Sequence, residues 1–404
     1  MITGETYKVH IGSNLDVLPT LEDNSIDSIV TDPPYELGFM GKKWDSSGIA
    51  YSVELWKECL RVLKPGGHLL SFGGTRTWHR VAVAIEDAGF EVRDSIAWMY
   101  GSGFPKSLNV GKSIEAKLTT GSAAKNGFHK LEGKRTGDEK IGMYATVAEH
   151  GFRSHNPEQL GAFDLEATTP EAQQWEGWGT ALKPAFEPIV VARKPLIGTV
   201  AQNVLTHGTG ALNVDGSRIG TGEGVVTFDR TKRKVEGNTY DLGTVTGLRE
   251  SGQGRWPSNV ILDEYSAEIL DEQSDASRFF YVAKASKRDR NEGLEGLPLR
   301  KSDQRSDVAA GLWAEMEAPK QNFHPTVKPT DLMRYLVKLV TPPNGTVLDP
   351  FTGSGSTGKA AILEGFRFVG IELTEDYIPI IEGRLKHAEA MLSATQDQEE
   401  EKLF

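Results

Sequence analysis

The stretch from Ser25 to Tyr35, SIDSIVTDPPY, ends a short apolar run with an aspartate, two prolines and an aromatic residue. Asp32 provides a carboxylate, and the two prolines provide carbonyl acceptors on a backbone whose φ angles the proline rings fix. A turn that needed only flexibility would favour glycine or asparagine. This turn is stiff, and it predicts a fixed group of acceptors next to the ring of Tyr35.

A second pattern that could carry chemistry lies near the C-terminus, where a glycine-rich segment, GSGSTG, begins at Gly353 and leads into a helix-like segment. Glu372 follows Gly353 by 19 residues, which is the spacing of an acidic clamp on a ribose hydroxyl. Asp349 precedes the glycines, and its carboxylate can bind an ammonium group but would repel a pyrophosphate. S-adenosylmethionine carries an amino group, a sulfonium and a ribose, so it fits this loop best.

Two other interpretations use the glycine loop alone. Gly353, Gly358 and Lys359 nearly match a phosphate-binding P-loop, but Ala360 stands where a serine or threonine should bind Mg²⁺. A dehydrogenase or a nucleotide-binding regulator would leave the stiff turn at Asp32 unexplained. Displacement of S-adenosylmethionine by NAD or ATP would favour that class.

The elements expected around these patterns are those of an α/β protein. Strand-like and helix-like segments alternate over the first hundred residues and again after about residue 320, which predicts a parallel sheet covered on both faces. Glycine, serine, threonine and charged residues dominate the region between, so we expect one α/β core with a long, loop-rich insertion. The expected strands are 2–12, 25–31, 68–72, 94–100, 188–192, 346–348 and 366–371. The expected helices are 53–63, 76–88, 331–340 with Thr330 as N-cap, and one from about 356.

The composition limits the remaining function classes. The chain has 404 residues, a formal net charge of −11 and a single cysteine, Cys59. One cysteine excludes an internal disulfide framework and a cysteine-rich zinc site, and we predict no metal site. No signal peptide and no apolar run of membrane-spanning length are evident, which predicts a soluble, cytoplasmic protein.

Three motifs together resemble the DNA amino-methyltransferases, which methylate N6 of adenine or N4 of cytosine. Residues 31–35 (TDPPY) match the catalytic D-P-P-Y element, residues 349–357 (DPFTGSGST) match the cofactor loop, and residues 324–329 (HPTVKP) match the H-P-T-x-K-P element that closes over the methionine moiety. Their order, with the catalytic motif first, is similar to the permuted β class. The resemblance covers about residues 5–110 and 320–390, with a weaker match near 178–195.

The resemblance implies a set of site residues. Those expected to be catalytic are Asp32, Pro33, Pro34 and Tyr35, and those expected to bind S-adenosylmethionine are Asp349, Phe351, Gly353, Ser354, Gly355, Glu372, Thr326 and Lys328. An exocyclic amino group is a poor nucleophile until its lone pair is localised. Asp32 and the Pro33 carbonyl can each accept one of its N–H bonds, while Tyr35 can stack on a base taken out of the duplex.

The resemblance also implies the fold: a Rossmann-like class I S-adenosylmethionine-dependent methyltransferase with a mostly parallel seven-stranded sheet. We expect a catalytic core at 1–101 and 321–392, completed by a return strand at about 184–195. We place that strand, residues 188–192, as the antiparallel edge of the sheet beside residues 94–100. An inserted target-recognition region would occupy 102–183 and 196–320, and an acidic tail 393–404.

Double-stranded DNA is the expected partner despite the negative net charge. Basic residues gather between Arg278 and Arg305, and lysine and arginine make the phosphate contacts that position a duplex. The candidates are Lys284, Lys287, Arg288 and Arg290. The competing interpretation is an exposed basic loop without a partner. A second copy of this chain and a restriction endonuclease are further partners that the sequence leaves open.

Adenine N6 is the favoured target, because aspartate at the first position of D-P-P-Y is more typical of adenine enzymes and serine of N4-cytosine enzymes. N4-cytosine methylation is the close alternative, and methylation of RNA or of a protein amide is a more distant one. A catalytically silent DNA-binding relative would not need both complete motifs. C5-cytosine chemistry requires a thiolate, and Cys59 lies mid-helix as an expected buried hydrophobe.

Overall fold

The computed structural model describes residues 1–37, 43–101, 103, 107–121, 167–220, 254–284, 287–300 and 321–401. The chain divides into two compact units: unit 1 consists of Met1–Gly101 and Phe186–Phe404, and unit 2 of Ser102–Ala185. Residues 254–300 therefore group with the sheet-bearing unit, although we place them in an inserted recognition region. Their part in recognition stays a prediction.

Unit 1 is built on a sheet whose ten described strands run in the order β1-β2-β10-β9-β3-β4-β6-β5-β7-β8. Five neighbours, from β2 to β4, are parallel, and β6 is antiparallel to both β4 and β5. This confirms the α/β class with a mostly parallel sheet. The strands are β1 (Ile2–Thr3), β2 (Tyr7–Ile11), β3 (Ile26–Thr31), β4 (Leu63–Phe72), β5 (Glu91–Met99), β6 (Phe186–Arg193), β7 (Val260–Asp263), β8 (Tyr281–Ala283), β9 (Thr346–Asp349) and β10 (Arg367–Glu372).

The sheet is wider than the seven strands expected, and one expected edge is wrong. Residues 188–192 do pair antiparallel with β5, but β6 lies inside the sheet between β4 and β5. β7 and β8 extend the sheet beyond β5 with parallel pairing. The continuous burial of β6 from Pro188 to Ala192 is the pattern of an interior strand, which has neighbours on both sides.

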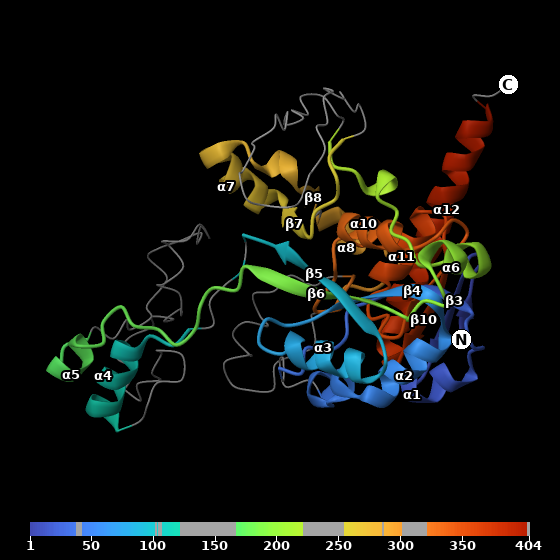
Figure 1. Cartoon of the computed structure of the whole chain (residues 1–404). Helices are drawn as coiled ribbons and strands as arrows, with labels where there is room; N and C mark the ends of the chain where they lie inside the picture. Colours follow the sequence, from blue (N-terminus) through green and yellow to red (C-terminus); the bar gives the residue numbers. More distant parts are fainter. Residues whose placement is uncertain are drawn as a thin grey trace, which may run out of the picture. The chain divides into compact units, whose positions relative to one another are not determined.

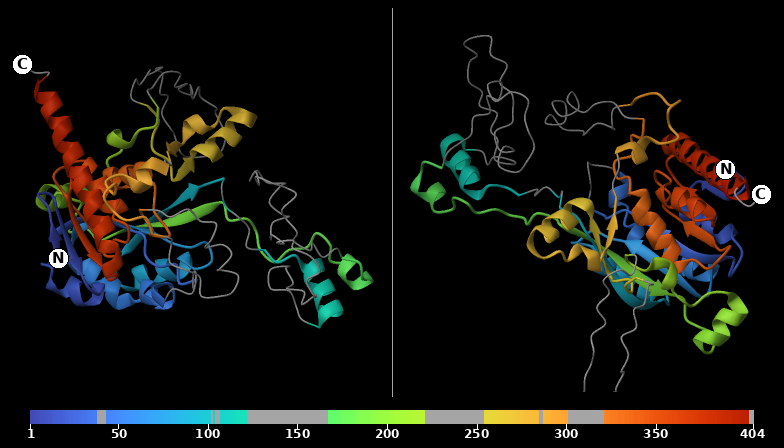
Figure 2. Two further views of the ribbon diagram at one scale, coloured as in Figure 1. Left: turned by 180° about the vertical axis from the view of Figure 1, so that it is seen from behind. Right: turned by 90° about the horizontal axis from the view of Figure 1, so that it is seen from above.

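Helices cover both faces of the sheet (Figures 1 and 2). Alternate residues of a strand point to opposite faces, so Val30 and Leu70 pack with α10, α11 and α12 while Ile29 and Leu69 pack with α2 and α3. The helices of unit 1 are α1 (Asn14–Val17), α2 (Val53–Val62), α3 (Trp78–Asp87), α6 (Val200–His207), α7 (Glu264–Ser274), α8 (Lys287–Asn291), α10 (Thr330–Val340), α11 (Ser356–Leu363) and α12 (Ile378–Glu401).

Two helix ends differ from expectation. Thr330 is the first residue of α10 rather than its N-cap, and its N–H and Oγ1 both donate to the carboxylate of Asp289. The cap is therefore a side chain from a distant segment, which local spacing cannot reveal. The expected acidic tail begins inside α12, which runs to Glu401.

None of the helices in the described part of the chain combines the length and the apolar character that a membrane span requires.

Unit 2 contains α4 (Val110–Thr120) and α5 (Pro170–Gln173). The buried carboxylate of Glu115 accepts hydrogen bonds from the N–H and hydroxyl groups of Thr168 and Thr169, and these bonds lower its pKa. A short bridge joins Asn109 to Gly179. Glu115 thus ties the two helices of this unit together.

Candidate active site

The carboxyl ends of β3, β9 and β10 lie side by side, and each ends in or next to an acidic residue. Parallel pairing of β3 with β9 and of β9 with β10 brings Asp32, Asp349 and Glu372 to one edge of the sheet. Thr31 Oγ1 donates to Asp349 Oδ1 at 2.6 Å. The structure therefore brings the D-P-P-Y turn and the glycine loop together, at the edge where open α/β folds bind ligands.

The two carboxylate oxygens of Asp32 have different surroundings. Oδ2 lies 2.9 Å from Nζ of Lys328. Among the described residues, Oδ1 is buried and has no hydrogen-bond partner. Burial raises the pKa of Asp32, and the Lys328 ammonium opposes that rise. The turn thus presents one open acceptor oxygen.

A ring of polar groups surrounds the Lys328 ammonium. Nζ lies 3.1 Å from Oε2 of Glu187 and donates to the Tyr35 hydroxyl at 3.1 Å. The Tyr35 hydroxyl in turn donates to Glu187 Oε2 at 2.8 Å. Burial lowers the pKa of Lys328, but the carboxylates of Asp32 and Glu187 outweigh this effect and raise it above its usual value.

Glu187 is a site residue that sequence reasoning missed. It lies in β6, next to the D-P-P-Y turn in space but 152 residues from Tyr35 in sequence. The available signal was the resemblance of residues 178–195 to the family, within which Glu187 precedes a proline and a buried apolar run. Nothing in the spacing of that segment pointed to Tyr35.

Asp349 is buried at the end of β9 and is held by three donors. Thr31 Oγ1 and the N–H of Phe351 donate to Oδ1 at 2.6 and 3.0 Å, and Thr357 also contributes a hydrogen bond. Burial raises the pKa of Asp349 to about 6 in spite of these bonds. Asp349 therefore fixes the start of the glycine loop, and it offers a carboxylate to a cationic ligand.

Glu372 closes the other side of the glycine loop. Oε2 accepts the N–H of Gly353 at 2.7 Å, and Oε1 accepts the N–H of Thr374 at 2.7 Å. A carboxylate has about four acceptor positions, so two remain for a ligand, and that ribose hydroxyls take them stays a prediction. Burial raises the pKa of Glu372 to about 7.

This pKa predicts a pH-dependent affinity for the cofactor. Ionised Glu372 accepts hydroxyl hydrogen bonds better than the protonated acid, so affinity should rise by roughly tenfold between pH 6 and 8 and level off above. Titration calorimetry with S-adenosylhomocysteine measures it. The Glu372→Gln variant should keep at most the roughly twofold rise that ionisation of Asp349 contributes, and a full rise of roughly tenfold in the variant would contradict the assignment.

His324 covers the glycine turn. A Cβ on Gly353 would lie 3.0 Å from Nε2 of His324, and Gly353 has a φ of +54°. His324 itself is buried against the ring of Tyr377, with centroids 4.6 Å apart, and burial lowers its pKa to about 3. Its Nδ1 accepts the N–H of Thr326 at 3.4 Å, so the neutral ring orders the H-P-T-x-K-P segment.

Gly353→Ala should weaken cofactor binding because the new methyl group meets His324 and disturbs the Gly353 hydrogen bond to Glu372. Gly365→Ala is the matched control: its φ is +79°, but a Cβ there meets nothing within 4 Å. Both variants should lose about 1–2 kcal/mol of unfolding free energy in urea titrations from backbone strain. Only Gly353→Ala should lose affinity for S-adenosylhomocysteine. Equal affinity for S-adenosylhomocysteine in the two variants would show that the contact between residue 353 and His324 does not affect cofactor binding.

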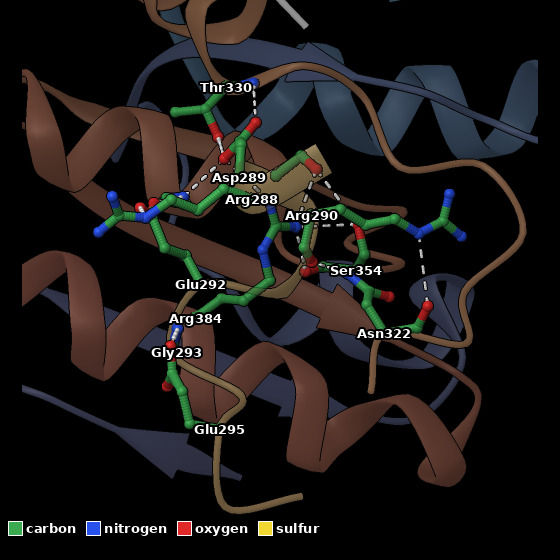
Figure 3. Close-up of polar contacts among 12 residues, drawn as sticks. Arg288, Asp289, Arg290, Glu292, Gly293, Glu295, Asn322, Thr330, Ser354 and Arg384 are labelled. Atoms are coloured by element: carbon green, nitrogen blue, oxygen red, sulfur yellow. Dashed lines mark hydrogen bonds and ion pairs between the residues drawn. The ribbon is translucent and has the colours of Figure 1, made fainter. Parts of the chain in front are cut away.

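A cluster of charged side chains, Asp289, Glu292, Lys359 and Arg384, lies next to the glycine loop, and Arg384 contacts the loop directly (Figure 3). Arg384 of α12 is fully buried, and its Nη1 donates to the Ser354 carbonyl at 2.8 Å and to the hydroxyls of Ser354 and Ser356 at 3.1 and 3.0 Å. Ser354 is buried, and Gly355 is the N-cap of α11 with a φ of +74°. Ser354 and Gly355 thus shape the loop; direct contact of either residue with the cofactor stays a prediction.

The same cluster joins α8 to α10 and α11. Asp289 Oδ1 lies 2.6 Å from Nζ of Lys359, and Glu292 Oε2 lies 3.0 Å from it. Asp289 also receives both Thr330 bonds, as Figure 3 shows. Lys359, the lysine of the P-loop-like pattern, is 1% exposed, so its charge is used inside the protein.

The four candidate DNA contacts have different environments. Lys284 is exposed, and the side chain of Lys287 lies outside the described residues. Arg288 is 87% exposed and pairs with Glu292 at 3.2 Å. Arg290 donates to the carbonyls of His324 and Asn322 at 2.6 and 3.4 Å, so it holds the H-P-T-x-K-P segment. Phosphate contacts by these residues stay predictions.

Comparison with known proteins gives the family. The DNA methylase model for N6 and N4 enzymes matches residues 26–383. The Type II methyltransferase M.SfiI of Streptomyces fimbriatus is 43% identical over 438 aligned residues, which cover 93% of this chain and 90% of that protein. The chain belongs to the DNA methylase family. This DNA methylase also matches the Type II methyltransferase M.ScaI of Streptomyces caespitosus, 38% identical over 73 residues, 18% of the chain but only 24% of M.ScaI.

Among solved structures, PvuII DNA methyltransferase, described as cytosine-N4-specific, aligns with a TM-score of 0.44 and 13% identity over 95% of this chain and 87% of that one. The family membership of this methylase confirms the predicted class of DNA amino-methyltransferases and S-adenosylmethionine as the methyl donor. It argues against a dehydrogenase or a nucleotide-binding regulator, the two classes that use the glycine loop alone.

Cys59 is fully buried, and burial raises the pKa of its thiol far above the usual value. It is therefore a core residue, as the sequence predicts.

Proposed function

We propose that this DNA methylase transfers a methyl group from S-adenosylmethionine to the exocyclic N6 of adenine in double-stranded DNA. The observation that carries the proposal is the open, buried Oδ1 of Asp32, next to the cofactor loop. A carboxylate oxygen buried without a partner is costly, and such groups are kept where a substrate supplies the missing donor. An amino group supplies that donor.

The D-P-P-Y turn activates the amino group. Asp32 Oδ1 accepts one N–H and the Pro33 carbonyl accepts the other, which localises the nitrogen lone pair. Pro33 and Pro34 fix both acceptors before the substrate arrives, and such preorganisation supplies much of the barrier reduction. Bound S-adenosylmethionine supplies an electrophilic methyl group. The methylated nitrogen is more acidic and loses its proton to Asp32 or to water.

The target base must leave the duplex to reach this turn. A base inside a helix is out of reach of a buried carboxylate, so extrusion of the nucleotide precedes the reaction. Tyr35 is held by two hydrogen bonds: its carbonyl accepts from Thr77 Oγ1, and its hydroxyl donates to Glu187 Oε2. The fixed ring offers a face on which the extruded base stacks.

Cofactor binding is proposed for the loop between β9 and β10. Glu372 would accept the ribose hydroxyls, Asp349 would face the amino group, and Phe351, Gly353, Ser354, Gly355 and Thr326 would line the loop. Asp349 and Glu372 fit this cofactor because it brings both a cation and hydroxyl donors to two buried carboxylates. Unit 2 and the exposed Lys284 and Arg288 are proposed to contact the DNA.

The product distinguishes the two amino-group targets. Purified protein is incubated with unmethylated genomic DNA and S-adenosylmethionine, and the DNA is digested to nucleosides whose masses are measured. We expect N6-methyldeoxyadenosine. N4-methyldeoxycytidine would keep the mechanism and overturn the choice of base, and the absence of both would overturn the proposed function.

A further inference from the structure

The proposed activation of the amino group uses Asp32 and the Pro33 carbonyl and gives no role to Lys328 or Glu187. Lys328 nevertheless contacts Asp32, and Glu187 contacts Lys328. Nζ of Lys328 lies 2.9 Å from Asp32 Oδ2 and 3.1 Å from Glu187 Oε2, and the lysine side chain is 8% exposed. The ammonium also lies 4.8 Å from the ring centroid of Phe72 and 5.3 Å from that of Tyr35. Two carboxylates and two aromatic faces therefore surround one buried cation.

This arrangement gives the two carboxylate oxygens of Asp32 different roles. Lys328 holds Oδ2, while Oδ1 is the buried oxygen without a partner among the described residues. A carboxylate held at one oxygen has a fixed plane, so its other oxygen points in one direction. The ammonium also favours the ionised form of the carboxyl group, which burial alone would disfavour.

Glu187 fixes the position of the ammonium in turn. Its Oε2 accepts from Lys328 and from the Tyr35 hydroxyl, so lysine, glutamate and tyrosine form one connected group. Its negative charge acts on Asp32 in the opposite sense to that of Lys328, because like charges disfavour ionisation.

Resting on the proposed function, we infer that Lys328 and Glu187 are positioning residues for methyl transfer: Lys328 holds Oδ2 of Asp32 and Glu187 holds Lys328, so that ionised Oδ1 faces the target amino group. This differs from the role in cofactor binding that the H-P-T-x-K-P resemblance implies for Lys328. If Lys328 binds the cofactor, its loss should lower cofactor affinity and leave the pH dependence unchanged. If it positions Asp32, its loss should shift the pH dependence and leave cofactor affinity unchanged.

The test is the pH dependence of kcat/KM for DNA at saturating S-adenosylmethionine, where cofactor binding no longer contributes and the acid limb reports the ionisation of Asp32 in the cofactor-bound enzyme before DNA binds. Lys328→Met should move the acid limb upward by about 1–3 pH units, because an opposite charge is lost. Glu187→Gln should move the limb downward, because a like charge is lost while the hydrogen-bond acceptor remains. Lys338→Met, which removes an α10 lysine that pairs with Glu364 at the end of α11, should leave the limb in place.

Affinity for S-adenosylhomocysteine, measured by calorimetry, separates the two roles. We expect Lys328→Met to change it by less than about twofold. Shifts in the same direction for both variants, or no shift, would overturn the inference, as would a large loss of cofactor affinity in Lys328→Met with an unmoved limb. If Lys328→Met does not fold, the direction in Glu187→Gln decides alone. A wild-type protein that methylates no DNA would overturn the proposed function instead.

Discussion

Asp32→Asn should lower kcat for DNA methylation by about a hundredfold to a thousandfold while cofactor affinity stays unchanged. The amide has nearly the same shape as the carboxylate but carries no charge, and one of its two polar atoms is a donor. It can no longer offer a strong acceptor at Oδ1 while Lys328 occupies Oδ2. Single-turnover methylation of genomic DNA measures the loss, and calorimetry with S-adenosylhomocysteine measures cofactor affinity.

Asp215→Asn is a suitable control, since that carboxylate is 77% exposed and pairs with Arg218, three residues along the chain. It should methylate at the wild-type rate. A fall in cofactor affinity that accounts for the whole activity loss of Asp32→Asn would show that Asp32 serves the cofactor rather than the target amino group.

Lys359→Met should lower the free energy of unfolding by about 3–5 kcal/mol, because it leaves Asp289 and Glu292 without their shared cation. The lysine is 1% exposed, so the methionine side chain would lie buried against two carboxylates that have lost the cation between them. The loss should also loosen α8, whose Asp289 caps the start of α10. Urea titration followed by circular dichroism measures the change.

Lys386→Met is the matched control. Lys386 pairs with Glu382 at 2.7 Å one turn away on α12, and its side chain is 63% exposed. Exposed pairs of this kind contribute about 0.3–0.5 kcal/mol. If Lys359→Met were no less stable than this control but lost most of its cofactor affinity, Lys359 would be a ligand of the cofactor, as in a P-loop.

The sequence predicts the elements next to the chemistry well, because their signals are local. Periodic apolar residues in Val53–Val62 and Thr330–Val340 identify α2 and α10, and the apolar run before Asp32 identifies β3. The proximity of Asp32 and Asp349 also follows from the sequence, since both end strands of one parallel sheet. Thr31 and Asp349 are in direct contact.

Contacts between distant segments are what the sequence could not provide. Glu187 reaches Tyr35 only because β6 inserts between β4 and β5, and that neighbour relation is set by the whole sheet. Asp289 lies in a charged segment typical of an exposed loop, but the packing of α8 places it against Lys359. The packing of α8 also explains Arg290: the sequence predicts a phosphate contact for it, but its guanidinium donates to the His324 carbonyl.

The most direct test of a site-specific adenine methyltransferase that depends on Asp32 is single-molecule sequencing of modified DNA. The chain is expressed in a bacterial host that lacks its own DNA methyltransferases, in parallel with the Asp32→Asn variant. We predict modified adenines confined to one short sequence context in the wild type and none in the variant. Modified cytosines, modification without a common context, or equal modification in the variant would contradict the account.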